Sequence, residues 1–171
     1  MRFFCLFFLV LSACSFLNED KKQEAELEYE FDNTLAFNEY LTEYLGTDGI
    51  NNSGKSHYLI LTPRGCPSCQ VKMKRCFAEN PDGFVEKSNL TIILVNNLSG
   101  YDSNNIGFIF DRLKDSFKSY KDEEGYLFFK GIDLNTSALI TTKNGEVERI
   151  FEFYTDDVSD IMHELFNLEC N

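Results

Sequence analysis

The sequence predicts an α/β fold in which helices cover both faces of a central mixed β-sheet. Amphipathic helical segments alternate with apolar strand-like segments along the chain. One of these segments, Leu90–Val95, is apolar almost throughout, which is typical of a strand covered on both faces. Near the end, the pair Asn144-Gly145 lies between the predicted strands Ser137–Thr142 and Val147–Tyr154. Because Asn-Gly is a strong hairpin signal, these two strands are expected to pair antiparallel.

The first three predicted elements are a helix, a strand and a helix. Apolar residues recur at helical spacing from Thr34 onward, and Gly46 is expected to end this helix. Residues Tyr58–Leu61 form a short buried strand that ends near Pro63. The second helix is predicted over Pro67–Glu79, where the apolar side chains that share one stripe are Cys69, Met73, Cys76 and Phe77.

The remaining elements lie on either side of the hairpin. The pattern of apolar residues predicts a helix from Ile106 to Tyr120. Residues Tyr126–Phe129 are too short to assign from their pattern, and a small strand is one interpretation. After the hairpin, Thr155 or Asp156 is expected to cap a final amphipathic helix.

The chain begins with a segment typical of export signals. Arg2 precedes a short apolar run, residues 3–11, that is too short to span a bilayer. The run ends in Leu11-Ser12-Ala13-Cys14, which resembles the lipobox of bacterial lipoproteins. The resemblance implies that residues 1–13 are a lipoprotein signal peptide and that Cys14 is acylated, whereas an ordinary signal before an incidental cysteine is the alternative. Two acyl chains give stable anchoring to a bilayer.

Residues 14–32 are expected to be an acidic flexible tether, because acidic side chains far outnumber lysines there. The tether joins the anchor to one folded domain, residues 33–171. The expected location is the cell envelope, on the outer membrane or the periplasmic side of a bacterial membrane. The formal net charge of −12 argues against nucleic acid as a partner, because phosphate binding depends on lysine and arginine.

Two of the six cysteines precede the predicted domain and four lie within it. Of the first two, Cys5 belongs to the leader and Cys14 is the anchor. An exported protein can form disulfides, and the cysteines that remain for two bridges are Cys66, Cys69, Cys76 and Cys170. Cys76 is expected to be a buried small apolar residue, and a bridge to Cys170 or a third redox thiol are the alternatives.

Residues Tyr58–Phe77, with Cys66-Pro67-Ser68-Cys69 between a strand and a helix, resemble the thioredoxin superfamily. Residues 143–147 resemble the terminal hairpin of that family, and the match covers roughly residues 33–168. The resemblance implies a thioredoxin-like three-layer α/β/α fold with a central mixed β-sheet. It also implies thiol–disulfide exchange without a bound cofactor.

The spacing of the two cysteines suits this chemistry. A cysteine at a helix start meets unpaired N–H groups and the positive end of the helix dipole, which favour thiolate, so Cys66 is the expected nucleophile. Cys69 lies one turn deeper on nearly the same face and is the expected resolving thiol. Pro67 suits the first helical turn, and Arg64 is close enough to favour the Cys66 thiolate.

Two positions depart from the family pattern. Gly65 stands where many thioredoxins have tryptophan. The cis-proline that faces the cysteines in the family falls near Ser137, preceded by Thr136, and this chain has no proline there. In the family that proline shapes partner binding, so its loss raises the question of how a partner is bound.

Two functions follow from these residues. The first is a membrane-anchored thiol–disulfide oxidoreductase acting on cysteine-containing exported proteins, or with a membrane redox partner, through Cys66 and Cys69. The second is a thioredoxin-like cell-envelope binding module in which the same pair is a stabilising disulfide. Half of a zinc site is a weaker alternative, because the ligands left to complete it have no familiar spacing, namely Cys76, Cys170, His57 and His163.

Overall fold

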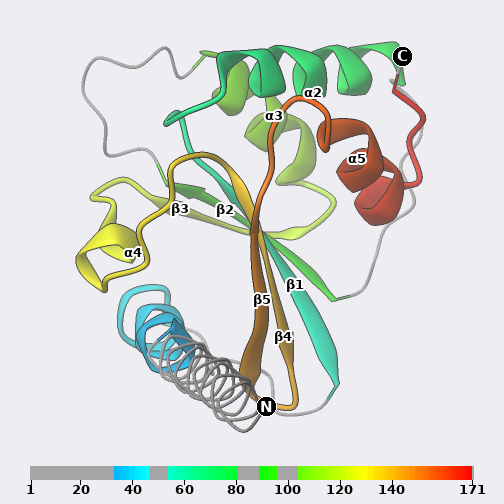
Figure 1. Ribbon diagram of the computed structural model, residues 1–171. Coiled ribbons are helices and arrows are strands. Elements are labelled where there is room, and N and C mark those ends of the chain that lie inside the picture. Colours follow the sequence, from blue (N-terminus) through cyan, green and yellow to red (C-terminus); the bar gives the residue numbers. More distant parts are fainter. Residues whose placement is uncertain (1–32, 47–53, 81–88, 96–103, 171) are drawn as a thin grey trace, which may run out of the picture.

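The computed structural model describes residues 33–46, 54–80, 89–95 and 104–170. A five-stranded sheet lies between two groups of helices (Figure 1). The predicted signal peptide, the predicted acylation site Cys14 and the predicted tether lie outside the described residues. Within the described ranges, no helix has the length and apolar character needed to cross a membrane.

The sheet is mixed. Its strands are β1 (Lys55–Leu61), β2 (Leu90–Val95), β3 (Lys118–Asp122), β4 (Ala138–Lys143) and β5 (Glu146–Glu152), in the order β3-β2-β1-β4-β5. β1 and β2 pair in parallel, as do β2 and β3, whereas β4 is antiparallel to both β1 and β5. With the cysteine-bearing helix directly after β1 and a hairpin before the last helix, this is the predicted thioredoxin-like fold.

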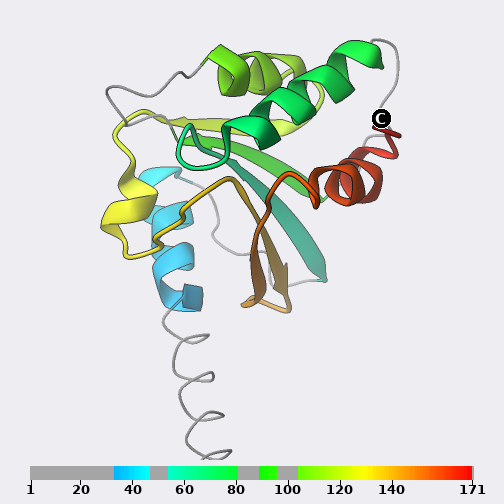
Figure 2. The ribbon, with the colours of Figure 1, turned by 45° about the horizontal axis from the view of Figure 1, so that its top comes forward.

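Helices cover both faces of the sheet, as predicted (Figure 2). One face carries α2 (Pro67–Glu79), α3 (Asn104–Leu113) and α5 (Val158–Phe166). The other face carries α4 (Tyr126–Phe129) and the first helix, residues 33–44, whose last turn, η1 (Tyr40–Tyr44), is wound as a π-helix.

The interior strand β2 contributes side chains to both cores. Ile92 and Leu94 pack in the core under α2, α3 and α5. Ile93 and Val95 pack in the core on the opposite face. Because successive side chains of a strand point to opposite faces, a strand covered on both sides is apolar along nearly its whole length. The apolar run seen in the sequence therefore has the predicted cause.

The prediction of one helix from Ile106 to Tyr120 is wrong in its second half. α3 ends at Leu113, and the edge strand β3 begins at Lys118. Phe117 lies outside the helix but is buried in the same core as Leu113, so its spacing imitates a further helical turn. β3 itself is charged and partly exposed, as edge strands commonly are.

The short segment Tyr126–Phe129 is a helix and not a strand. The buried carboxylate of Asp122 accepts hydrogen bonds from the backbone N–H groups of Tyr126 at 2.9 Å and Leu127 at 3.0 Å. These bonds satisfy donors that have no partner inside the helix, so Asp122 fixes where α4 starts.

The terminal hairpin forms where the sequence predicts it. Asn144 (φ 53°) and Gly145 (φ 88°) both have positive φ, which is the geometry of a tight primed turn between β4 and β5.

The cap of the last helix differs from the prediction. α5 starts at Val158 with Asp157 at the cap position. Thr155 lies before the helix, and its hydroxyl is 3.4 Å from Cys66 Sγ.

Candidate active site

The loop after β1 brings Cys66 to the start of α2. β1 ends at Leu61, and Cys66 occupies the cap position of α2 with Pro67 as the first helical residue. Cys66 and Cys69 form a disulfide with their Cα atoms 5.3 Å apart. Cys66 is half-buried, whereas Cys69 is only 2% exposed, so Cys66 is the sulfur that a partner protein can reach.

The two sulfurs have different surroundings. Cys66 Sγ accepts a hydrogen bond from the backbone N–H of Cys69 at 3.2 Å and lies 3.4 Å from the hydroxyls of Ser68 and Thr155. Cys69 Sγ has no backbone N–H among its described contacts: it lies 3.8 Å from the backbone carbonyl oxygen of Phe153, which only accepts hydrogen bonds, and 3.8 Å from the Thr155 hydroxyl. Donors favour a thiolate and an acceptor favours a protonated thiol. The local chemistry therefore supports negative charge on Cys66 more than on Cys69.

Thr155, one of the two residues predicted as possible helix caps, lies instead beside the two cysteines. It lies in the loop between β5 and α5, and its hydroxyl is 2.6 Å from the hydroxyl of Ser68. The Lys72 ammonium donates to the Thr155 carbonyl oxygen at 3.2 Å. This bond gives Lys72 a part in holding the loop at the cysteines.

Thr136 and Ser137 lie just before β4, in the segment that the resemblance assigns to the cis-proline. The Ser137 hydroxyl accepts from the Thr62 N–H at 3.1 Å and donates to the Thr62 carbonyl oxygen at 3.4 Å. The Thr136 N–H donates to the Glu152 carboxylate at 3.1 Å. No peptide bond of the described residues is cis. Polar contacts within the chain thus hold this segment against the end of β1.

Arg64 lies two residues before Cys66, and its side chain contacts Asp133 and Phe128 of α4. Its guanidinium pairs with Asp133 at 3.0 Å and stacks over the Phe128 ring, 3.9 Å from the ring centre. These contacts connect the active-site loop to α4. Electrostatic support of the Cys66 thiolate by Arg64 stays a prediction.

Cys76 is not a free buried thiol. It forms a disulfide with Cys170, 94 residues further along the chain, with the Cα atoms 5.1 Å apart. This corrects the expectation of a lone apolar cysteine and bears out the bridge that had been its alternative. The bond ties the chain after α5 to the C-terminal half of α2. The histidines lie elsewhere: His57 Nδ1 is 3.3 Å from the Thr141 hydroxyl, and His163 is exposed on α5.

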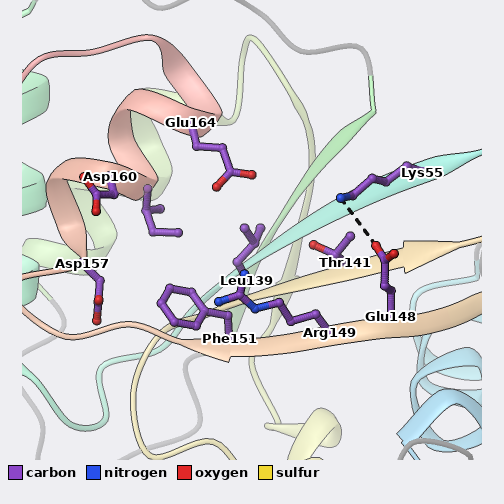
Figure 3. A pocket seen from close by; sticks show the side chains of 10 residues that line it. Lys55, Leu139, Thr141, Glu148, Arg149, Phe151, Asp157, Asp160 and Glu164 are labelled. Atoms are coloured by element: carbon purple, nitrogen blue, oxygen red, sulfur yellow. Dashed lines mark ion pairs between the residues drawn. The ribbon is translucent and has the colours of Figure 1, made fainter.

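A pocket of about 520 Å³ lies between the sheet and α5 (Figure 3). Acidic side chains from the α5 end line one side, and the Lys55–Glu148 ion pair closes another. Arg149 stacks over the Phe151 ring inside this lining, 4.3 Å from the ring centre. No cysteine is among the described residues that line the pocket, so it is separate from the disulfide.

No protein-family model and no curated protein sequence matches the chain. Among solved structures, the chain is similar to a secreted Mycobacterium tuberculosis disulfide oxidoreductase homologous to E. coli DsbE. Their identity is 14% and their TM-score 0.35, over 66% of this chain and 82% of that chain.

The chain is also similar to a thioredoxin-like protein from Porphyromonas gingivalis, with 14% identity and a TM-score of 0.38 over 69% of this chain and 77% of that chain. StoA from Bacillus subtilis shares 20% identity with a TM-score of 0.31, over 64% of this chain and 81% of that chain. The strand order, the hairpin and the position of the Cys66–Cys69 disulfide themselves establish that this chain has a thioredoxin-like fold with a Cys-x-x-Cys pair at the start of its second helix.

Proposed function

We propose that the chain is a thiol–disulfide oxidoreductase that exchanges disulfides with cysteine-containing exported proteins. The observation that carries this proposal is the asymmetry of the pair. Cys66 is half-buried and accepts a hydrogen bond from a backbone N–H, with two hydroxyls 3.4 Å away, whereas Cys69 is buried 3.8 Å from a carbonyl oxygen. A purely structural disulfide needs no such difference between its two sulfurs.

The exchange needs only the two cysteines. In the disulfide form, a partner thiolate attacks Cys66 Sγ, the Cys66–Cys69 bond breaks, and its electron pair leaves on Cys69. A second partner thiol then attacks the mixed disulfide, so the partner gains a disulfide and the pair is reduced. In the reverse direction, the Cys66 thiolate attacks a partner disulfide and Cys69 resolves the mixed disulfide. The two electrons stay on sulfur throughout, so no bound cofactor is required.

The proposed location is the bacterial cell envelope. Acylated Cys14 would hold residues 33–171 at a membrane through the acidic tether, residues 14–32. A second redox protein of the membrane would then return the pair to its starting state after each turnover. The sequence features behind this part of the proposal are the lipobox and the acidic run.

A binding module is the second candidate, and one observation favours it. The backbone N–H of Thr136 donates a hydrogen bond to the Glu152 carboxylate of the same chain, and the Ser137 hydroxyl accepts one from the Thr62 N–H. Groups that already have partners within the chain are not free to bind the backbone of a substrate beside Cys66. In this reading the two disulfides stabilise the domain, and another surface binds the partner.

Reduction of insulin by dithiothreitol, with the full chain in detergent as catalyst, tests the proposal. Wild type is expected to accelerate the reaction, and Cys66→Ser is expected to abolish the acceleration. Cys69→Ser is expected to accumulate a mixed disulfide on Cys66, because the resolving thiol is missing. The matched control is Cys76→Ala with Cys170→Ala, which removes the other disulfide and should keep turnover. Equal rates for wild type and Cys66→Ser would favour the binding module.

A further inference from the structure

We propose that Thr155 is a catalytic hydroxyl of the cysteine pair, which hydrogen-bonds whichever sulfur carries the negative charge, with Ser68 as its partner hydroxyl. The consequence for turnover rests on the proposed function. The effect on the cysteines themselves is measurable without any partner protein.

The first support is a triangle of three polar atoms. Cys66 Sγ lies 3.4 Å from the hydroxyl oxygens of both Ser68 and Thr155, and the two oxygens lie 2.6 Å apart. Two hydroxyl protons serve these three contacts. One proton fills the short bond between the oxygens, which leaves the other for sulfur. Whichever way the bond between the oxygens runs, one hydroxyl donates to Cys66 while accepting from its neighbour.

The second support is that Thr155 contacts both sulfurs. Its hydroxyl oxygen is 3.8 Å from Cys69 Sγ, whereas the only sulfur with a described contact to the Ser68 hydroxyl is that of Cys66. During exchange, attack on Cys66 breaks the disulfide and leaves the electron pair on Cys69. A rotation of the Thr155 O–H then directs it toward the new thiolate as a hydrogen-bond donor, which the nearby Phe153 carbonyl oxygen cannot be. No proton is transferred, and only the hydrogen bond moves.

The third support is that the backbone at Thr155 is held from two sides. The Lys72 ammonium of α2 binds the Thr155 carbonyl oxygen. The Asp157 carboxylate accepts a hydrogen bond from the Tyr154 N–H at 2.8 Å. A hydroxyl on an anchored loop loses little entropy when it donates to sulfur. Lys72 is a positioning residue because it acts through Thr155.

The charged groups around the pair are Lys72 on α2, Asp157 before α5, Arg64 in the active-site loop and Glu152 at the end of β5. Arg64 is paired with Asp133, and Glu152 accepts from the N–H groups of Asn135 and Thr136. None of these four is removed by changes at Ser68 or Thr155. A change in the reactivity of Cys66 in such variants therefore measures the effect of the lost hydroxyls, and not of a lost charge.

The test is the pH profile of Cys66 alkylation in the reduced full chain, read by mass spectrometry of the Cys66 peptide after iodoacetamide. Ser68→Ala with Thr155→Val is expected to raise the midpoint by roughly one pH unit, about a tenfold loss of thiolate below it, because a hydrogen bond to an anion is lost. In each single variant, the remaining hydroxyl still donates to Cys66. What is lost is the polarisation of that hydroxyl by its neighbour, which strengthens a hydrogen bond by roughly 10–30%. The midpoint of each single variant should therefore shift by less than about half as much as that of the double variant.

Thr155→Ser keeps the hydroxyl but removes the methyl group, so it distinguishes the effect of the hydrogen bond from that of side-chain packing. It is expected to keep the wild-type midpoint. If Thr155→Ser shifts the midpoint as far as Thr155→Val, or if the double variant shifts nothing, the proposal is overturned. A midpoint that responds as expected in a chain without insulin turnover would support the hydroxyl role and reject the proposed enzyme.

A single-turnover measurement separates Thr155 from Ser68. Reduced chain is mixed with 5,5′-dithiobis(2-nitrobenzoate), and release of the second thionitrobenzoate reports attack by Cys69 on the Cys66 adduct. Thr155→Val is expected to slow this step severalfold, because the attacking Cys69 thiolate loses its donor, whereas Ser68→Ala should match wild type. Equal slowing by the two variants would contradict a role for Thr155 at Cys69.

Discussion

A β-carbon at Gly65 would overlap the backbone oxygen of Asn135 and lie 2.8 Å from the β-carbon of Thr136. Gly65 also has φ +78°, a left-handed conformation that glycine adopts easily. The residue before Cys66 thus packs against the segment before β4, far away in the sequence. This contact leaves no space for the tryptophan that many thioredoxins carry at this position.

Gly65→Ala is expected to destabilise the domain by more than about 2 kcal/mol. The left-handed backbone alone costs an alanine roughly 1–2 kcal/mol, and the overlap with Asn135 adds to this. Urea unfolding at pH 7, followed by circular dichroism, measures the change in the free energy of unfolding.

The matched control for the overlap is Gly131→Ala. Gly131 has φ +90°, but an added β-carbon there meets nothing within 4 Å. Its substitution should therefore cost only the backbone strain, roughly 1–2 kcal/mol. If the two variants unfold at the same urea concentration, close packing at Gly65 contributes nothing to stability.

Glu152→Gln is expected to loosen the segment beside the cysteines. The Glu152 carboxylate accepts from the N–H groups of Asn135 at 2.8 Å and Thr136 at 3.1 Å. Glutamine keeps one acceptor oxygen but not the charge, so we expect a loss of about 1 kcal/mol. Hydrogen exchange should be faster at these two amides than in wild type.

Glu148→Gln serves as the control on the same strand. Glu148 pairs only with exposed lysines among the described ion pairs, Lys55 at 3.5 Å and Lys143 at 3.9 Å. Such surface pairs contribute roughly 0–1 kcal/mol, so amide exchange at Asn135 and Thr136 should stay as in wild type. Faster exchange in both variants would point to a general loss of strand charge in place of the specific bonds.

Cys76→Ala with Cys170→Ala is expected to lower the free energy of unfolding by up to about 4–5 kcal/mol. A bridge that closes a loop of this length restricts the unfolded chain strongly, and engineered examples commonly give less than the entropic value. Urea unfolding of the oxidised proteins measures the loss. Reductant should destabilise wild type by a similar amount and leave the double variant nearly unchanged, unless Cys66–Cys69 is itself the main stabilising bond.

The elements that the sequence predicts well are those whose signals are local. The start of α2 follows from Pro67 after Cys66, and the hairpin follows from Asn144-Gly145, because each residue type favours one backbone geometry. The continuous apolar run of β2 is equally direct, since burial on both faces requires it.

The elements that the sequence does not predict depend on distant contacts. β3 carries the pattern of an exposed segment because it is an edge strand, and Phe117 before it imitates helical spacing. Thr155 looks like a helix cap, and only the path of the chain after β5 brings its hydroxyl to Cys66. The pairing of Cys76 with Cys170 likewise needs the position of the chain end, which no spacing rule provides.

Tyr40→Phe is expected to reduce the loss of stability at alkaline pH. Burial raises the pKa of Tyr40, and the negative charge of Asp122 raises it further. The folded protein therefore keeps this phenol protonated above pH 10, where the unfolded chain releases its proton. The contribution of this group to the free energy of unfolding is fully present below pH 10. It decreases as the pH rises further, with a limiting slope of about 1.4 kcal/mol per pH unit.

Urea unfolding between pH 8 and pH 11 measures this slope, and Tyr40→Phe should show a shallower decline than wild type. Tyr58 has a pKa raised mainly by burial and is present in both proteins, so it does not contribute to the difference. Tyr154 is 54% exposed, and Tyr154→Phe is the matched control that should follow the wild-type curve. If Tyr40→Phe declines as steeply as this control, ionisation of the buried phenol is not coupled to unfolding in this pH range.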